Sequence, residues 1–136
     1  MMDANFTQQT PDFYEVLRSL SIDSDVIVCN RLANPTPAQA KFSVEHAVWM
    51  SCDSGIKKYL VDARQTLPPN AELRKALREF IRRFIGHFEA MAIVVDENPT
   101  SYVSAQFIFH NHELPDNMHF RLCTTMEEGR EFLSQF

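Results

Sequence analysis

The clearest pattern in the chain is a run of apolar side chains at three- and four-residue spacing between Glu72 and Phe88. This spacing places them on one face of a helix. Charged residues fill most of the positions between them. The segment therefore predicts an amphipathic helix with a buried face formed by Leu73, Ala76, Leu77, Phe80, Ile81, Phe84, Ile85 and Phe88.

Short apolar runs elsewhere predict strands. KKYLVDARQ (57–65) and AMAIVVDE (90–97) hold nearly continuous apolar stretches, which are typical of parallel strands covered on both faces. The prolines of LPPNAE lack backbone donors, so the first run cannot continue through that segment. MHFRLC (118–123) is expected to be the last strand.

The N-terminal part of the domain predicts a β-hairpin or two adjacent strands. FYEVLRSL (13–20) and DVIVCNRL (25–32) are apolar-rich and are separated by the polar stretch SIDS. Residues 1–12 are expected to form a flexible tail, which leaves residues 13–136 for the domain.

Further helices are predicted from their boundaries. One begins with Thr36 before Pro37, the preferred order for an N-cap and the first helical position, and ends at Gly55. Apolar residues within it also fit a two-residue alternation, but its length favours a helix over a strand. Another helix is expected from about Thr100, and a last one follows Thr125, a typical N-cap residue.

Helices and strands therefore alternate along the chain from residue 36. Such alternation predicts a mostly parallel central sheet with right-handed crossovers. At 136 residues the chain fits one domain. The expected fold is a single α/β domain in which the N-terminal hairpin joins the sheet and about four helices cover it.

Composition and cysteine usage favour a cytoplasmic globular protein. Hydrophobic residues make up 45% of the chain and charged residues 23%, which is far from a disordered composition. The sequence has no run of about 18 apolar residues, and its N-terminus carries acids where a secretory signal has basic residues. Cys29, Cys52 and Cys123 are odd in number and far apart, which favours reduced core thiols over disulfides.

The charge distribution argues against general nucleic-acid binding. The formal net charge is −5, whereas phosphate contacts need clustered Lys and Arg. Segment 71–88 departs from this average, because its charge of +3 leaves −8 for the remainder. Its basic face could dock an acidic partner or an anionic membrane surface. It could also simply be solvated, with Glu79 as a neighbour of its cations.

Five polar residues at the ends of the two most buried strands form the first candidate site. They are Asp62 and Arg64 after one strand, and Asp96, Glu97 and Asn98 after the next. Ligands of open α/β sheets gather outside the carboxyl ends of the strands, so this edge is the default binding site. Asp62 and Arg64 could instead pair with each other or cap neighbouring helices.

The histidine-rich segment HNHELPDNMH is the second candidate site. It holds His110, His112 and His119 together with Glu113 and Asp116. Zinc and other borderline metals accept such nitrogen and carboxylate ligands, so a metal-binding protein or a metal-dependent enzyme is the alternative function. The other interpretation is a polar loop, since no second motif supplies the supporting shell of a metal site.

Other catalytic chemistry finds no support in the sequence. It contains no Gly-x-Ser-x-Gly elbow, Walker loop or dinucleotide-binding fingerprint, and three glycines are too few for phosphate cradles. No cofactor is therefore expected. His46 and Trp49 are expected to be core or interface residues, and Cys52 a small packed residue rather than a nucleophile.

The central strands and the C-terminus resemble those of the STAS-like domains, and within them the SpoIIAA-like group of small bacterial proteins. The resemblance rests on YLVDARQ as a strand ending in Asp-x-Arg, on MAIVVDEN as the next strand, and on FRLCTTMEEGREFL as a strand and short helix. It covers roughly residues 13–136. It implies a non-enzymatic regulatory module that binds a protein partner or a small apolar ligand.

The same resemblance bears on Ser54, which lies in an Asp-Ser-Gly triplet. Anti-sigma-factor antagonists of this fold carry a phosphorylatable serine in a turn after the strand that corresponds to YLVDA. Here that turn is RQTLPPNAE, with Thr66 and Asn70 but no serine, whereas Ser54 precedes the strand. The module is therefore expected to lack the serine phosphoswitch, and Ser54 to mark only the end of a helix.

The aromatic content predicts self-association. Eleven phenylalanines, with a terminal cluster of Phe132, Leu133 and Phe136, exceed what one thin α/β core is expected to bury. Exposed apolar patches usually mark interfaces, and a two-fold dimer uses one patch twice. We therefore expect a homodimer to which the first or the last helix contributes.

Overall fold

The computed structural model describes residues 12–98 and 118–136. Its strands form one five-stranded sheet in the order β1-β2-β3-β4-β5, in which β1 is antiparallel to β2 and the other pairs are parallel. This confirms the predicted α/β class and the mostly parallel sheet. The elements are α2 (Phe13–Ser19), β1 (Leu20–Asp23), β2 (Val26–Asn30), α3 (Pro37–Ser54), β3 (Lys58–Asp62), α4 (Ala71–Phe84), a 3₁₀ helix (Ile85–His87), β4 (Ala90–Val94), β5 (His119–Cys123) and α6 (Met126–Leu133).

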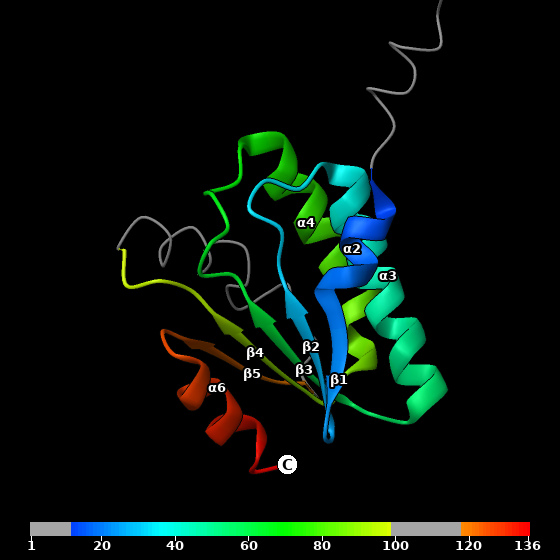
Figure 1. Cartoon of the computed structure of the whole chain (residues 1–136), viewed down its shortest axis with the longest axis vertical. Coiled ribbons are helices and arrows are strands. Elements are labelled where there is room, and N and C mark those ends of the chain that lie inside the picture. Colours follow the sequence, from blue (N-terminus) through cyan, green and yellow to red (C-terminus); the bar gives the residue numbers. More distant parts are fainter. Residues whose placement is uncertain (1–11, 99–117) are drawn as a thin grey trace, which may run out of the picture.

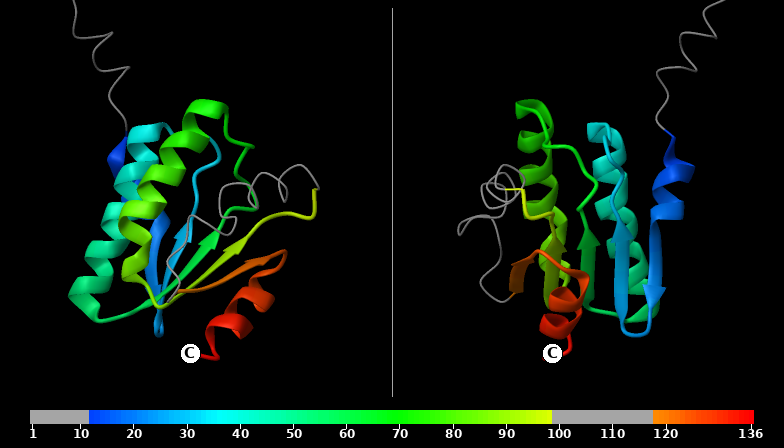
Figure 2. Two further views of the ribbon diagram at one scale, coloured as in Figure 1. Left: turned by 180° about the vertical axis from the view of Figure 1, so that it is seen from behind. Right: turned by 60° about the vertical axis from the view of Figure 1, so that its left-hand side comes forward.

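Helices cover both faces of the sheet. α2, α3 and α4 lie on one face and α6 lies on the other (Figure 1), as the two turned views also show (Figure 2). Successive residues of a strand point to opposite faces. Tyr59 and Met91 therefore belong to the core under α2, α3 and α4, whereas Leu60 and Ala92 belong to a second core under α6.

The boundaries of α3 follow from its capping residues, as predicted. Thr36 and Gln39 form a reciprocal capping box, in which each backbone N–H donates to the other side chain at 3.0 and 3.1 Å. Pro37 occupies the first turn, where its missing N–H costs nothing. Gly55 ends the helix with φ 78°, a left-handed conformation that favours glycine.

The amphipathic helix is shorter than predicted and its apolar face is buried unevenly. Asn70 caps α4 by accepting a hydrogen bond from Leu73 N at 2.8 Å. The α-helix ends at Phe84, and the 3₁₀ turn that follows contains Gly86, a residue of low helix propensity. The apolar side chains that recur every four residues from Leu73 are buried. Phe80 and Phe84 are only half-buried.

The prediction of a strand at residues 13–20 was wrong. Most of this segment forms α2, because Asp12 caps it by accepting a hydrogen bond from Glu15 N at 3.1 Å. Val16 and Leu20, which are four residues apart, are both buried in the core under the helices. The hairpin exists, but its first strand is Leu20–Asp23, whose last three side chains are exposed at the edge of the sheet.

The remaining predicted elements hold with shorter limits. β3 and β4 end at Asp62 and Val94, and α6 begins after Thr125, whose Oγ1 accepts a hydrogen bond from Glu128 N at 3.1 Å. The helix expected from about Thr100 lies outside the described residues, as does the tail but for its last residue. No helix in 12–98 or 118–136 is both long and apolar enough to cross a membrane.

Candidate ligand-binding site

The parallel strands β2, β3 and β4 end together at one edge of the sheet (Figure 1). Backbone hydrogen bonds continue the ladder past the strand ends. Arg31 N donates to the carbonyl oxygen of Asp62 at 3.0 Å, and Ala63 N donates to that of Val94 at 2.8 Å. The residues that follow β2 and β3 are therefore held in fixed positions relative to the sheet.

Asp62 and Arg64 form a pair at this edge, which is the alternative that the sequence left open. Arg64 Nε donates to Oδ1 of Asp62 at 2.9 Å, and its Nη2 donates to Oδ2 at 2.8 Å. The backbone N–H of Arg64 also donates to Oδ1, at 3.2 Å. Hydrogen bonds from the guanidinium lower the pKa of Asp62, so this carboxylate is already bound within the protein.

Asp96, Glu97 and Asn98 follow β4 in a turn of their own. The backbone N–H of Asn98 donates to Oδ1 of Asp96 at 3.1 Å, which closes the turn, and Glu97 is exposed. The predicted site residues therefore follow neighbouring strands, and both the Asp62–Arg64 pair and the turn after β4 have hydrogen bonds of their own.

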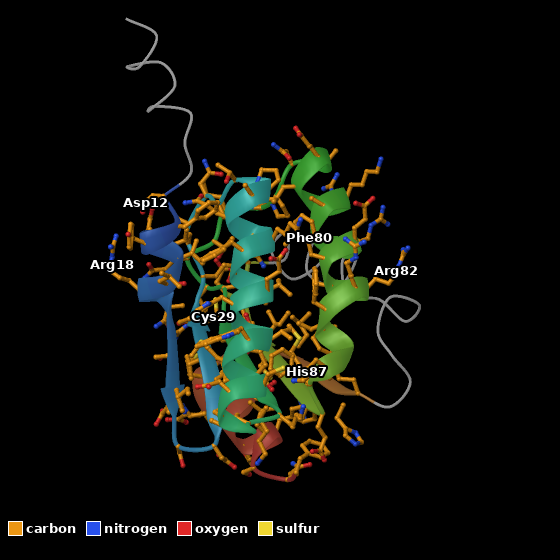
Figure 3. All side chains as sticks on the ribbon, turned by 90° about the vertical axis from the view of Figure 1, so that its right-hand side faces the viewer. Asp12, Arg18, Cys29, Phe80, Arg82 and His87 are labelled. Carbon is orange, nitrogen blue, oxygen red and sulfur yellow. The ribbon has the colours of Figure 1, made fainter. Side chains whose placement is uncertain are left out.

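A cavity of about 40 Å³ lies between the sheet and helices α2, α3 and α4, next to the end of β2. Each surrounding element contributes an apolar wall, for example Val16 of α2, Val44 of α3, Ile81 of α4 and Met91 of β4. Figure 3 shows one of its lining residues, Cys29, beneath α2 and α3. None of the five predicted site residues belongs to this lining.

Six polar residues complete the lining: Ser19, Cys29, Arg31, Gln39, Ser43 and Tyr59. Burial raises the pKa of Tyr59 well above its usual range, so its hydroxyl stays protonated. Burial also lowers the pKa of Arg31, because the charged form loses hydration. The site is thus an apolar space with neutral hydroxyls and one cation.

A second pocket, of about 170 Å³, lies between the loops that precede α3 and α4. Prolines form much of its lining, and Pro35 borders both this pocket and the cavity. Asn70, which also lines it, is already engaged as the cap of α4. The pocket therefore lies beside the cavity at the same edge of the sheet.

Three polar side chains surround His87 near the C-terminal end of α3 (Figure 3). Its Nε2 lies 2.9 Å from Lys57 Nζ, 3.0 Å from Ser51 Oγ and 3.7 Å from Cys52 Sγ. Burial and then the Lys57 charge lower the pKa of His87. Ser51 is fully buried and its hydroxyl donates to the carbonyl of Ile56, so it is not placed to attack a substrate.

The structure describes one of the three candidate metal ligands. His119 is exposed on β5, and its ring stacks on Phe136 with centroids 4.3 Å apart. His110 and His112 lie outside the described residues. Within 12–98 and 118–136, no group of three or more His, Cys, Asp or Glu side chains is placed to hold a metal ion.

One prediction about a packed side chain was wrong. Cys52, in the last turn of α3, is exposed rather than packed. Trp49 was expected in the core or at an interface; it is 59% exposed, which excludes the core, and its ring stacks on half-buried His46. Cys29 and Cys123 are buried, as expected, and burial raises the pKa of Cys123 to about 11.

Ser54 lies at the end of a helix, as predicted. It is the last residue of α3, and its Oγ donates to the carbonyl of Met50 at 2.7 Å. The same oxygen accepts a hydrogen bond from Ile56 N at 3.2 Å. Both hydrogen bonds of its side chain are therefore to nearby backbone groups.

Sequence reasoning missed both Arg31 and His87. Arg31 comes directly after β2, separated by one residue from its apolar run, and a basic residue at that position was the available signal. His87 stands inside the apolar stretch FIGHF, where a lone polar residue marks a buried contact. Comparison with models of protein families gives no match, and comparison with curated proteins gives no relative.

Proposed function

We propose that this chain is a non-enzymatic STAS-like binding module that lacks the serine phosphoswitch and holds a small, mainly apolar ligand. The observation that carries the proposal is the cavity under α2, α3 and α4. It lies next to the end of β2, at the edge of the sheet where ligands of α/β folds collect. The order of strands and helices supports the STAS-like assignment.

The absence of a phosphoswitch is supported by the turn after β3. Its hydroxyl residue, Thr66, is half-buried, and Oγ1 donates to the carbonyl of Leu32 at 3.3 Å. This bond ties the turn to the loop that follows β2. A phosphoryl group on Thr66 would have to break that bond.

An apolar ligand fits the walls of the cavity better than a polar one. Buried apolar side chains that face empty space lose dispersion contacts, and a bound hydrocarbon restores them. Removing apolar surface from water makes the free energy of binding more favourable by roughly 25 cal/mol per Å². A space of about 40 Å³ holds roughly three water-sized groups, so the ligand or its buried end is small.

Propan-1-ol is a suitable first probe. We expect it to shift the methyl NMR signals of Ile81 and Met91, which line the cavity from α4 and β4. Ala40→Leu fills the cavity from α3 and should abolish these shifts. Ala38→Leu makes the same change at an exposed position of α3 and should leave them intact.

Failure of propan-1-ol and of its homologues up to butan-1-ol to shift these signals would contradict the proposal. Equal shifts in Ala40→Leu would place the bound alcohol elsewhere and contradict it as well.

We also propose that the protein is cytoplasmic and forms a homodimer. The dimer proposal is supported by a row of adjacent, partly exposed aromatic rings on α2 and α3, formed by Phe13, Phe42, His46 and Trp49. Trp49 and Tyr14 are 59% and 74% exposed. Sedimentation equilibrium that shows only a 15.7 kDa species at micromolar concentration would contradict it.

A further inference from the structure

Among the described residues, Arg31 is the one cation in the lining of the cavity, and its backbone is fixed at the edge of the sheet. Its side chain is half-buried between β2, β3 and α3. In the part of the chain that the structure describes, no carboxylate forms an ion pair with it. The nearest acidic residue along the ladder, Asp62, is engaged by Arg64.

The polar side chains around Arg31 have partners of their own. Gln39 accepts from Thr36 N and donates to the carbonyl of Asp12 at 3.1 Å. Ser19 donates to the carbonyl of Val16 at 2.6 Å. These groups are held by the backbone of α2 and α3, so they are not free to turn toward the guanidinium.

A half-buried guanidinium without a counter-ion has lost part of its hydration, and a bound anion would offset that loss. Its planar fork matches a carboxylate, with two parallel N–H donors for two oxygens. The neutral hydroxyls of Tyr59 and Ser43 border the same space, where they interact with each other and with Cys29. The rest of the lining is largely apolar, which suits a hydrocarbon chain but not the several oxygens of a phosphate.

We infer that the cavity binds a short-chain monocarboxylate, with its carboxylate on Arg31 and its hydrocarbon between α3, α4 and β4. This inference rests on the proposed function and adds the charge of the ligand to it. The size of the space limits the chain to roughly that of acetate, propionate or butyrate.

The test compares propionate with propan-1-ol, which have similar shape and differ in charge. We expect propionate to bind at least about tenfold more tightly, because each charge-assisted hydrogen bond contributes roughly a factor of ten. Arg31→Met should remove this preference, so that propionate binds no more tightly than propan-1-ol. Arg31→Lys keeps the charge without the fork and should weaken propionate binding to an intermediate value.

Arg18→Met is the matched control, because Arg18 is an exposed cation of α2 that lies outside the lining (Figure 3). It should leave propionate binding unchanged. Equal affinity for propionate and propan-1-ol would overturn the inference and leave the proposed function standing. Absence of binding by both would overturn both. Tighter binding of inorganic phosphate than of propionate, with loss in Arg31→Met, would overturn the choice of a carboxylate.

Discussion

The two faces of the sheet are packed in different ways. Under α6, small residues bring the helix close to the strands: a Cβ on Gly129 would lie 2.9 Å from Leu60 Cδ1 and 3.3 Å from Val94 Cγ2. Under α2, α3 and α4 the side chains are larger, and they enclose a cavity of about 40 Å³. One sheet thus has a filled face and a face with free space.

The difference shows how the same strands serve stability and binding separately. Protein interiors are close-packed, so a void in a small core costs stability unless a ligand fills it. Around Gly129, the described side chains under α6 leave no room for one. Changes to its residues should therefore affect folding alone, whereas changes to the face under α3 should affect ligand binding as well.

The largest expected effect is that of Leu60→Ala on the filled face. Leu60 is 0% exposed, and its Cδ1 is the atom closest to the space above Gly129. We expect the free energy of unfolding to fall by about 2–5 kcal/mol, because the substitution removes buried methyl groups and leaves a new cavity. Urea denaturation measures this.

Leu67→Ala is the control for that measurement. Leu67 is 58% exposed, so the same chemical change should alter the free energy of unfolding by no more than about 0.5 kcal/mol. A loss below about 1 kcal/mol for Leu60→Ala would show that the α6 face is loosely packed, and the contrast between the faces would disappear.

A smaller effect is expected when one methylene is added to each face. Val94→Ile under α6 should lower the free energy of unfolding by about 1–3 kcal/mol, because the face is already full. Val44→Ile adds the same group to a wall of the cavity and should raise it by up to about 1 kcal/mol.

Thermal and urea denaturation of both variants give the comparison directly. Equal destabilisation by Val94→Ile and Val44→Ile would mean that the cavity is not available to an added methylene. That result would also count against a bound hydrocarbon.

The sequence predicts the sheet and the helices of this comparison, but not the cavity. Periodicity and capping residues specify α3 and α4, since Thr36, Gly55 and the spacing from Leu73 act locally. The error at residues 13–20 came from counting apolar residues without testing the helical period: Phe13, Val16 and Leu20 also fit helical spacing.

The candidate site was harder to predict because its members come from separate segments. Asp62 and Arg64 stand two residues apart, and their pairing was foreseen as an alternative. Arg31 belongs to the cavity only because β2 is the neighbour of β3 and the helices cover their ends. Such a contact depends on strand order and helix packing, which a single sequence does not specify.

A third prediction concerns the pH dependence of stability. It involves only the face under α3, where His87 lies. Burial and Lys57 lower the pKa of His87, so the folded protein favours its neutral form. Above the usual histidine pKa of about 6.5 both folded and unfolded states are neutral, and no effect is expected. As the pH falls below that value the unfolded chain takes up the proton first, so stability falls.

His87→Gln removes this proton uptake. We expect its melting temperature to fall less steeply than that of the unchanged protein between about pH 6.5 and pH 5, measured by differential scanning calorimetry. Parallel curves for the two proteins would show that His87 titrates as it does in the unfolded chain. The other histidines are common to both proteins, so their effects cancel.

The smallest effect is expected at the edge where the two faces meet. Hydrogen bonds from Arg64 lower the pKa of Asp62, so the pair contributes stability above the unfolded carboxyl value of about 3.9 and loses it as the pH falls through the folded value. The pair is partly exposed, with Arg64 at 45%, so Asp62→Asn should cost at most about 1 kcal/mol at pH 7. Urea denaturation at pH 7 and at pH 3 measures this cost, with exposed Asp53→Asn as the control.

A cost that persists undiminished at pH 3 would mean that Asp62 acts through its shape rather than its charge. A cost of several kcal/mol at pH 7 would mean that the edge holds the two faces together, and that their packing is not independent.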